Sequence, residues 1–319
     1  MERGPMRGPL LAVAMSLLFP GLGMAQQSIS SSQDAAQSPA TTDTTDRAQG
    51  RKAPAGPTDP IIVTGRKPAS KKDISALVHA ITPPSPNDAP LPRFQSAVCF
   101  GSVGLERSVL EMIGYRLAAD AEQAGLKLAG DGCTPNILVV FTDGVATGID
   151  TLVRRKWWLF GDRTPSEIRT IVGERGPVRA WSNSEVLSRD GEHINQGGFL
   201  NVPIASRLVS PTRKDMLASI VLVERSAVIG KTSNQIADYL AMRTLGGARP
   251  RATGPTETIL SLFDGNTNRV PSELTAFDRG YLRGLYAGQA NAFAWSTRGL
   301  IVERVLKEQQ ADPPPFAEH

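Results

Sequence analysis

Few side chains in this sequence have the types and spacing that bond-breaking chemistry requires. The chain carries three histidines, His79, His193 and His319, and it lacks the motifs of zinc peptidases, serine hydrolases, β-lactamases and P-loop proteins. A zinc site needs several His, Cys or carboxylate ligands around one ion. We therefore predict no metal and no cofactor, and we assign His193, which lies in a polar turn, a structural or solvent-exposed role.

Carboxylates are the remaining candidates for acid–base chemistry, because a pair of Asp or Glu side chains in one cleft can hydrolyse a glycosidic bond. We select Asp238, Glu273 and Asp278 as candidate cleft carboxylates. Their convergence on a cleft would indicate a hydrolase, which could instead use a Ser or Thr nucleophile that the sequence does not locate. A filled apolar core around them would indicate a binding protein.

A basic and aromatic segment, "LVRRKWWLFGDR", is a candidate binding surface. Adjacent tryptophans on an extended segment point to opposite sides, so one of Trp157 and Trp158 would approach the core. Tryptophan beside arginine is typical of interface anchors and of sites that stack on sugars or hold anionic groups. The alternative is a single tryptophan that covers the core beside solvated basic residues. The candidate binding residues are Arg154, Arg155, Lys156, Trp157, Trp158 and Phe160.

The pattern of strands and helices that must position these residues predicts one α+β domain over residues 91–308, with a mixed sheet and packed helices. The stretches "FQSAVCFGSVG" (94–104) and "NILVVFTDG" (136–144) are typical of strands. Between them, residues 105–125 carry apolar side chains four positions apart, which predicts a helix. These segments form a β-α-β unit.

The second half of the domain is predicted to begin with strands and to end with helices. "GPVRAWSNSEVL" (176–187) and "GFLNVPIASRLV" (198–209) flank a polar turn and predict a hairpin, and "LASIVLVERS" (217–226) is the next strand. Three helices are predicted to follow, over residues 233–247, with Thr232 or Ser233 as the N-cap, over 274–286 and over 296–307.

The two cysteines, Cys99 and Cys133, predict one disulfide in an exported protein. The bridge would join the start of the first strand to the start of the second. It would close a loop of about 35 residues, which the loop-entropy account values at roughly 3–4 kcal/mol.

The first 25 residues have the pattern of a secretory signal peptide. Arg3 and Arg7 supply positive charge, an apolar stretch follows, and Gly23, Met24 and Ala25 form a small-residue cleavage site. We expect cleavage near Ala25 and a periplasmic or secreted protein. No later stretch reaches about 18 consecutive apolar residues, so we predict no transmembrane segment in the mature chain.

Residues 26–90 are predicted to be a disordered leader, because their polar composition offers too little apolar surface to offset the entropy of ordering. Residues 309–319 are predicted to be a loose tail. Within the leader, residues 59–67 contain "IIVTG", which resembles the strand-forming box by which outer-membrane receptors engage their energising partner. The leader could therefore tether the protein to outer-membrane machinery.

The net charge of the chain is too small to predict a nucleic-acid partner. It is +4 for the whole sequence, and removal of one acid and two bases, Glu2, Arg3 and Arg7, leaves +3. Nucleic-acid binding usually needs a concentrated basic face. We predict an envelope protein or an anionic envelope polymer as the partner, and the oligomeric state stays open.

Three consecutive segments resemble the metal-binding region of the metzincin zinc peptidases: "ADYLAMRTLGG" (237–247), "SLFDGN" (261–266) and "LTAFDRGYLRGLYAG" (274–288). In metzincins a helix with two histidines and a glutamate precedes a glycine turn. A Ser-x-Met turn beneath the metal follows, and then a helix of the form "L-x-x-x-D-x-x-x-[IL]-x-x-L-Y-G". Here Asp278 matches the aspartate of that last helix, and Phe263 replaces the Met.

The positions that would hold the zinc ligands carry other residues. If Asp238 takes the place of the glutamate, the histidine positions hold Ala237 and Ala241. If "TLGG" aligns with the end of the metzincin helix, they hold Tyr239 and Arg243. Neither register can bind zinc. The resemblance therefore implies a degenerate zincin-like domain that is not a zinc metallopeptidase.

The chain also resembles a group of uncharacterised exported bacterial proteins with a "C…GC-x-P-N-ILV-x-F" segment and a final "D-x-x-x-L-x-x-LY" helix. That resemblance brings no activity with it. We predict an exported, non-catalytic protein that binds an envelope component on a metal-free zincin-like scaffold. The alternatives are a hydrolase and a tethered partner of outer-membrane machinery.

Overall fold

The computed structural model of the chain describes residues 68–194, 209–250, 256–265 and 270–311. The predicted signal peptide, the "IIVTG" segment and most of the predicted strand at 198–209 lie outside the described residues. The folded part is an α+β domain built on a mixed sheet, as the sequence predicts.

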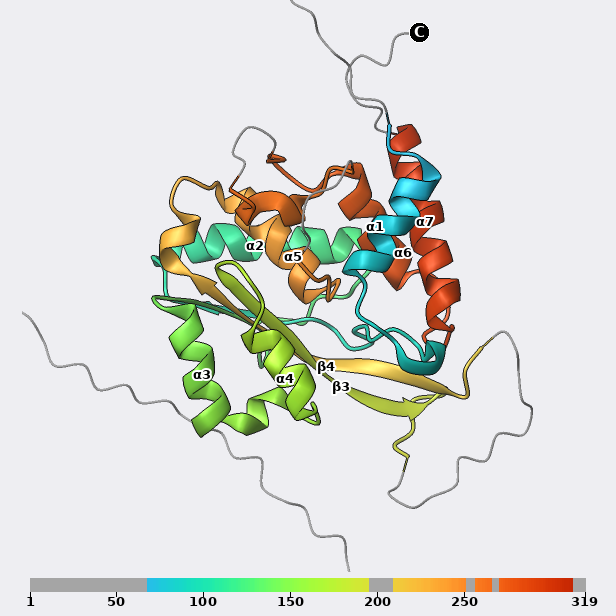
Figure 1. The fold of residues 1–319 in the computed structure, drawn as a ribbon, viewed down its shortest axis with the longest axis horizontal. Coiled ribbons are helices and arrows are strands. Elements are labelled where there is room, and N and C mark those ends of the chain that lie inside the picture. The colour runs from blue at the N-terminus through green and yellow to red at the C-terminus, as the bar shows by residue number, and fades with distance from the viewer. Residues whose placement is uncertain (1–67, 195–208, 251–255, 266–269, 312–319) are drawn as a thin grey trace, which may run out of the picture. The chain divides into compact units, whose positions relative to one another are not determined.

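The sheet holds four strands in the order β1-β2-β4-β3 (Figure 1). Strands β1, β2 and β4 run parallel, and β3 runs antiparallel to β4 at one edge. The partner of β3 among the described residues is thus the strand predicted to follow the hairpin. The strands are β1 (Phe100–Val103), β2 (Ile137–Thr142), β3 (Val178–Ser188) and β4 (Thr212–Glu224).

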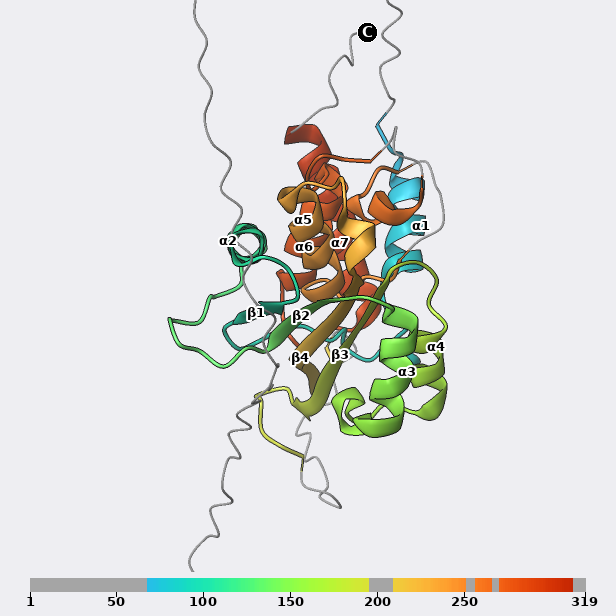
Figure 2. The same ribbon diagram turned by 90° about the vertical axis from the view of Figure 1, so that its left-hand side faces the viewer.

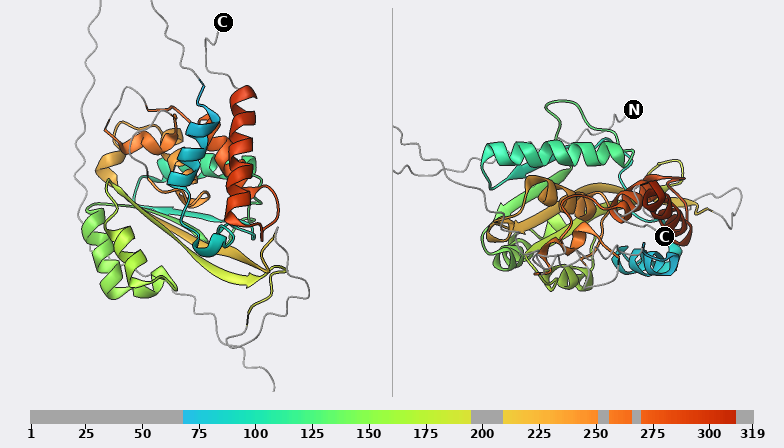
Figure 3. Two further views of the ribbon diagram at one scale, coloured as in Figure 1. Left: turned by 45° about the vertical axis from the view of Figure 1, so that its right-hand side comes forward. Right: turned by 90° about the horizontal axis from the view of Figure 1, so that it is seen from above.

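Helices cover both faces of this sheet (Figures 2 and 3). On one side, α3 packs against β3 and β4 and α4 packs against β3, and on the other side α5 packs against β3 and β4. The helices are α1 (Lys71–Ile81), α2 (Arg107–Gln123), α3 (Val145–Arg155), α4 (Pro165–Val172), α5 (Ser233–Thr244), α6 (Ala276–Tyr286) and α7 (Ala294–Ala311). The 3-10 turns are η1 (Pro86–Asp88), η2 (Trp157–Phe160), η3 (Arg225–Val228) and η4 (Ile259–Phe263).

The two faces of the sheet belong to two apolar clusters, because alternate side chains of a strand point to opposite sides. Val139 of β2 and Val221 of β4 point into the large cluster with α1, α2, α5, α6 and α7. Leu222 of β4 and Trp181 of β3 point into a smaller cluster with α3, η2 and α4. The smaller cluster carries the segment that the sequence selects as a binding surface.

Helix α1 corrects the predicted leader of residues 26–90. Its apolar residues at i, i+3, i+4 and i+7 are fully buried in the large cluster, and α1 packs against α7. Ser70 and Asp73 form a capping box at its start. The folded domain therefore includes residues before 91, and His79, predicted to lie in the leader, is on this helix.

Helices α6 and α7 cross closely because α6 carries glycine where α7 passes. A Cβ atom at Gly280 would lie 2.4 Å from the Cα of Val305, and one at Gly284 would lie 2.4 Å from the Cα of Ile301. The spacing of these glycines puts both on one helical face. This packing helps to fix the start of α6, where two of the candidate carboxylates are bound.

The disulfide between Cys99 and Cys133 is present, with the two Cα atoms 6.2 Å apart. It joins the residue before β1 to the loop before β2, as predicted. In the part of the chain that the structure describes, no helix is both long and apolar enough to span a membrane.

Candidate functional site

The candidate binding residues lie at the end of helix α3, on the side of the sheet that the smaller cluster covers. Helix α3 begins after Gly144, whose positive φ of 70° suits glycine. The carboxylate of Glu224, at the end of β4, accepts hydrogen bonds from the N–H groups of Gly144 and Val145 at 3.0 and 2.8 Å. These bonds lower the pKa of Glu224 and fix α3 to the sheet.

The turn η2, which follows α3, is anchored on β3. The ring of Phe160 is fully buried and stacks on Trp181, with ring centroids 4.8 Å apart. The carbonyl oxygen of Leu159 accepts hydrogen bonds from the indole N–H of Trp181 at 2.8 Å and the amide of Asn183 at 3.0 Å. The backbone of the turn is therefore held in one place.

Both tryptophans of the turn point outward. The exposed fraction is 66% for Trp157 and 53% for Trp158. The expectation that one of them approaches the core is wrong, because the segment is a helical turn and Phe160 fills the buried position. Phe160, one of the six candidate binding residues, is thus an anchor that does not reach the surface.

Three cations precede the tryptophans, and all are exposed: Arg154, Arg155 and Lys156. The Nζ atom of Lys156 lies 4.8 Å from the centre of the Trp158 ring, a cation–π contact. Within the described residues, no carboxylate forms an ion pair with any of the three. We call Arg154 to Trp158 the aromatic–basic corner.

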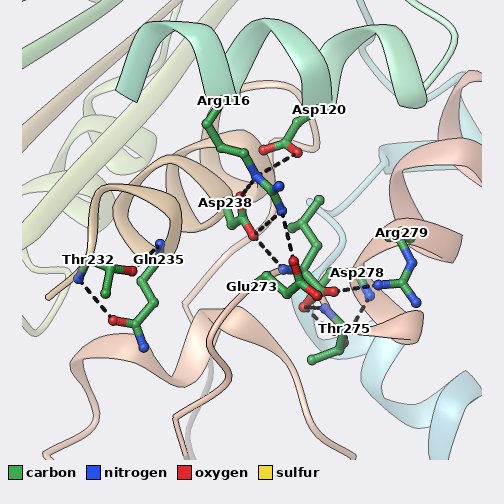
Figure 4. A network of polar contacts seen from close by, with 10 residues as sticks. Arg116, Asp120, Thr232, Gln235, Asp238, Glu273, Thr275, Asp278 and Arg279 are labelled. Atoms are coloured by element: carbon green, nitrogen blue, oxygen red, sulfur yellow. Dashed lines mark hydrogen bonds and ion pairs between the residues drawn. The ribbon is translucent and has the colours of Figure 1, made fainter. Parts of the chain in front are cut away.

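The candidate carboxylates belong to a polar network between α2, α5 and the start of α6 (Figure 4). Asp238 on α5 is fully buried and accepts two hydrogen bonds from Arg116 on α2, at 2.7 and 3.0 Å. It also accepts the N–H of Leu274. A bidentate guanidinium and a backbone donor satisfy this carboxylate, so Asp238 ties three segments together.

Asp120, which the sequence analysis did not select, lies beside this pair. Its carboxyl group is buried, 3.6 Å from the Nε atom of Arg116, and its protonated form can donate a hydrogen bond to Asp238. Burial and the negative charge of Asp238 raise the pKa of Asp120 to about 8, although Arg116 opposes the shift. Its surroundings therefore favour the protonated form of Asp120 in the folded chain.

Asp278 occupies a different position and has a capping role. It is fully buried, and with Thr275 it forms the capping box of α6. It also accepts hydrogen bonds from the hydroxyl of Thr258 at 2.5 Å and the N–H of Ile259 at 2.8 Å. Burial raises the pKa of Asp278 to about 6 in spite of these bonds. Asp278 thereby joins η4 to α6.

The three selected carboxylates do not line a common cleft. Asp238 and Asp278 are enclosed and bound, whereas the side chain of Glu273 is 60% exposed and lies 3.5 Å from Arg116. A shallow depression beside Asp120 contains about 160 Å³, part of it open solvent. Ligand pockets usually have about 300–1,000 Å³. This depression is smaller than a usual ligand pocket, and none of the three selected carboxylates lines it.

The sequence contains one signal for Asp120 and none for its partners. Asp120 falls seven residues after Ile113 in the stripe that also holds Leu117 and Ala121, so an acidic residue interrupts an apolar face. Such an interruption indicates a buried charge that needs a partner. The contact between Arg116 and Asp238 joins positions 122 residues apart, which no local pattern reveals.

A second ionic group lies on the opposite side of α5. It includes Arg243, which together with Tyr239 would occupy the zinc-ligand positions in one of the two alignments with the metzincins. Arg243 is buried and forms an ion pair with Glu174 at 2.6 Å. Tyr239, one helical turn earlier, meets the ring of Phe263 in η4 edge to face, with centroids 4.8 Å apart. Ala237 and Ala241, the positions of the other register, are fully buried in the large cluster.

The structure describes His193, to which the sequence analysis assigns a structural or solvent-exposed role. His193 is exposed, and its Nδ1 atom lies 2.7 Å from Glu185. No group of three or more His, Cys, Asp or Glu side chains that could hold a metal occurs among the described residues.

Comparisons with protein-family models, with curated proteins and with solved structures find no match to this chain.

Proposed function

We propose that this chain is an exported, non-catalytic protein that binds an anionic component of the cell envelope through the aromatic–basic corner. One observation carries the proposal: two adjacent tryptophans, Trp157 and Trp158, are more than half exposed on a turn that Phe160 anchors. The disulfide supports export, since disulfides persist in oxidising compartments.

Three properties of the corner favour a binding surface over a solvated helix end. Tryptophan is among the residues that contribute most to interfaces, because a large rigid ring contacts a partner at little cost in entropy. The turn loses little further freedom on binding, since the carbonyl of Leu159 is already held by Trp181 and Asn183. The neighbouring cations lack carboxylate partners among the described residues and so favour a negatively charged ligand.

We further propose that the domain is a zincin-like scaffold whose metal position is taken by an ion pair. In metzincins the Ser-x-Met turn lies beneath the face of the helix that carries the metal ligands. In this chain Phe263 stands in that turn. The residue of α5 that touches Phe263 is Tyr239, which favours the register with Tyr239 and Arg243 at the histidine positions. The guanidinium of Arg243, paired with Glu174, then stands where the metal of a peptidase would be bound.

The hydrolase alternative has one favourable observation, the raised pKa of Asp120, because perturbed carboxyl groups are frequent in active sites. A general acid must reach its substrate, however, and both oxygens of Asp120 are buried. The binding function is therefore the better supported of the two. The tether through residues 59–67 lies outside the described residues and stays a separate prediction.

A co-sedimentation experiment with purified bacterial cell envelopes tests the proposed function. We expect the full chain to sediment with the envelopes and the Trp157→Ala, Trp158→Ala double variant to bind at least about tenfold more weakly, as for a hot-spot pair. Trp295→Ala is the matched control, because Trp295 is 53% exposed on α7, away from the corner. A folded double variant that binds as tightly as the control would refute the proposal.

A further inference from the structure

We propose that the ligand of the aromatic–basic corner is the surface of an anionic lipid bilayer, into whose headgroup region Trp157 and Trp158 insert. This inference rests on the proposed function and names the partner of the same site. Its basis is the combination of two outward indole rings and three exposed cations within five consecutive residues of α3 and η2.

The indole ring suits the boundary between water and hydrocarbon. It has an apolar body and one N–H donor, and tryptophan is accordingly enriched at the headgroup level of membrane proteins. In this chain Trp181 donates its N–H to Leu159 and is buried. For Trp157 and Trp158 no hydrogen bond is present among the described residues, so both donors are free to meet headgroup oxygens.

The charge of the corner matches an anionic membrane. Arg154, Arg155 and Lys156 stand beside the tryptophans, and each basic residue near such a surface strengthens binding by roughly fivefold. Asp150 and Asp162 are the nearest carboxylates in the sequence. Neither is paired with these cations in the described part of the chain. The balance of charge at the corner is therefore positive.

The surroundings of the tryptophans favour lipid over a sugar polymer. Sites that orient a small polar ligand place hydrogen-bonding side chains beside the apolar surface that holds it. Here the residues on either side of the pair are Lys156, whose amino group is over Trp158, and Leu159, which is half-buried in the small cluster. The amide of Asn183, which lies close to this turn, already donates to the carbonyl of Leu159. A basic flank with two exposed rings fits a charged, deformable surface.

The anchored turn also explains how the rings reach a membrane without unfolding. Phe160 is held in the core against Trp181, so the backbone of η2 stays fixed while the two preceding side chains are exposed. The helix α3 before the turn is fixed at its other end by Glu224. The corner can thus act as a rigid wedge that enters the headgroup layer.

Vesicle binding of the purified full chain tests this inference. We expect binding to vesicles of phosphatidylglycerol and phosphatidylcholine in equal parts, and binding to pure phosphatidylcholine that is about 100-fold weaker, from three cations at roughly fivefold each. Insertion is measured by a blue shift of tryptophan emission and by quenching with lipids brominated on the acyl chain.

Three variants identify the residues responsible. Trp157→Ala with Trp158→Ala should abolish the blue shift and the quenching, and replacement of Arg154, Arg155 and Lys156 by Gln should remove the preference for phosphatidylglycerol. Trp295→Ala should change neither signal, since Trp295 is exposed on α7. Circular dichroism of each variant confirms that it is folded.

The outcomes separate this inference from the proposed function. Sedimentation with cell envelopes but not with anionic vesicles would overturn the lipid assignment and leave an anionic polymer or an envelope protein as the ligand. Binding to vesicles without quenching by brominated lipid would also overturn it, because the rings would then not be inserted. If the full chain binds neither cell envelopes nor anionic vesicles, both the lipid assignment and the proposed function are refuted.

Discussion

The polar network around Asp238 and the aromatic–basic corner use similar residues in opposite ways. In the network, every charged group except Glu273 is buried or half-buried. Arg116 forms ion pairs with Asp238, Asp120 and Glu273 at the same time. At the corner, by contrast, the cations are exposed and have no carboxylate partner among the described residues. The charged side chains of the network are paired with one another, whereas the cations of the corner can pair with a ligand.

This difference separates stability from function. A buried carboxylate that binds an arginine and a backbone N–H holds the fold, and its loss leaves other charges uncompensated. An exposed tryptophan contributes little to the fold, because most of its surface is already in water. Substitutions in the network should therefore change the free energy of unfolding, and substitutions at the corner should change binding alone.

The largest expected effect belongs to Asp238→Ala, which removes the acceptor of Arg116 and of the Leu274 N–H. We expect a loss of about 3–5 kcal/mol in the free energy of unfolding, measured by urea titration. Glu273→Gln is the control. The side chain of Glu273 is 60% exposed, so we expect its change to stay within about 0.5 kcal/mol. Equal stabilities for the two variants would contradict the structural role of Asp238.

Phe160→Ala should have the next largest effect, because it removes the ring that joins the corner to β3. We expect a loss of about 3 kcal/mol in urea titration, from the buried surface and the cavity left behind. The variant should also bind envelopes more weakly while its tryptophans remain. Unchanged envelope binding in a destabilised but folded Phe160→Ala chain would show that the anchor does not position the corner.

Asp120→Asn should alter how stability depends on pH. The ordinary pKa of this carboxyl is 3.8, and in the folded chain it is about 8, so between these values the folded chain binds more protons than the unfolded chain. Stability therefore declines as pH rises through that window, with the full penalty above pH 8 and none below pH 3.8. Arg116, Asp238 and Glu273 face this group.

The asparagine variant lacks this titration. Its free energy of unfolding should exceed that of the parent chain by roughly 4 kcal/mol more at pH 9 than at pH 5, since about three pKa units at 1.36 kcal/mol each lie between these pH values. Urea titrations at both pH values measure the difference. If the two chains show parallel profiles, the carboxyl of Asp120 is already ionised in the folded chain at neutral pH.

The smallest expected change in stability is that of the corner variant Trp157→Ala, Trp158→Ala. Both rings are more than half exposed, so we expect a change of about 0.5 kcal/mol or less. Thermal unfolding should shift by no more than about 2 °C for a domain of this size. A shift several times larger would mean that the rings belong to the core.

The sequence alone predicted those parts of the fold that depend on local patterns of residues. The β-α-β unit and the disulfide between Cys99 and Cys133 follow from apolar periodicity and an even count of cysteines. It failed for α1, whose four apolar residues are surrounded by a polar leader. It also failed for α3, where Gly148 and the run of basic residues weaken the helical signal.

The candidate sites were predictable only in part. Composition alone selected the segment of the corner, but the exposure of both tryptophans depends on Phe160 and Trp181, which are distant in the sequence and stacked in the fold. The role of Asp238 depends on Arg116 and Leu274, from two other segments. Long-range pairs of this kind arise from tertiary packing, which no single stretch of sequence encodes.

The most direct test of the central claim compares envelope binding and stability in one variant. The Trp157→Ala, Trp158→Ala chain should unfold within about 2 °C of the parent chain and should lose at least about tenfold in binding to cell envelopes. That result would place function at the corner and stability elsewhere. A double variant that is equally stable and binds envelopes as tightly as the parent chain would contradict the account.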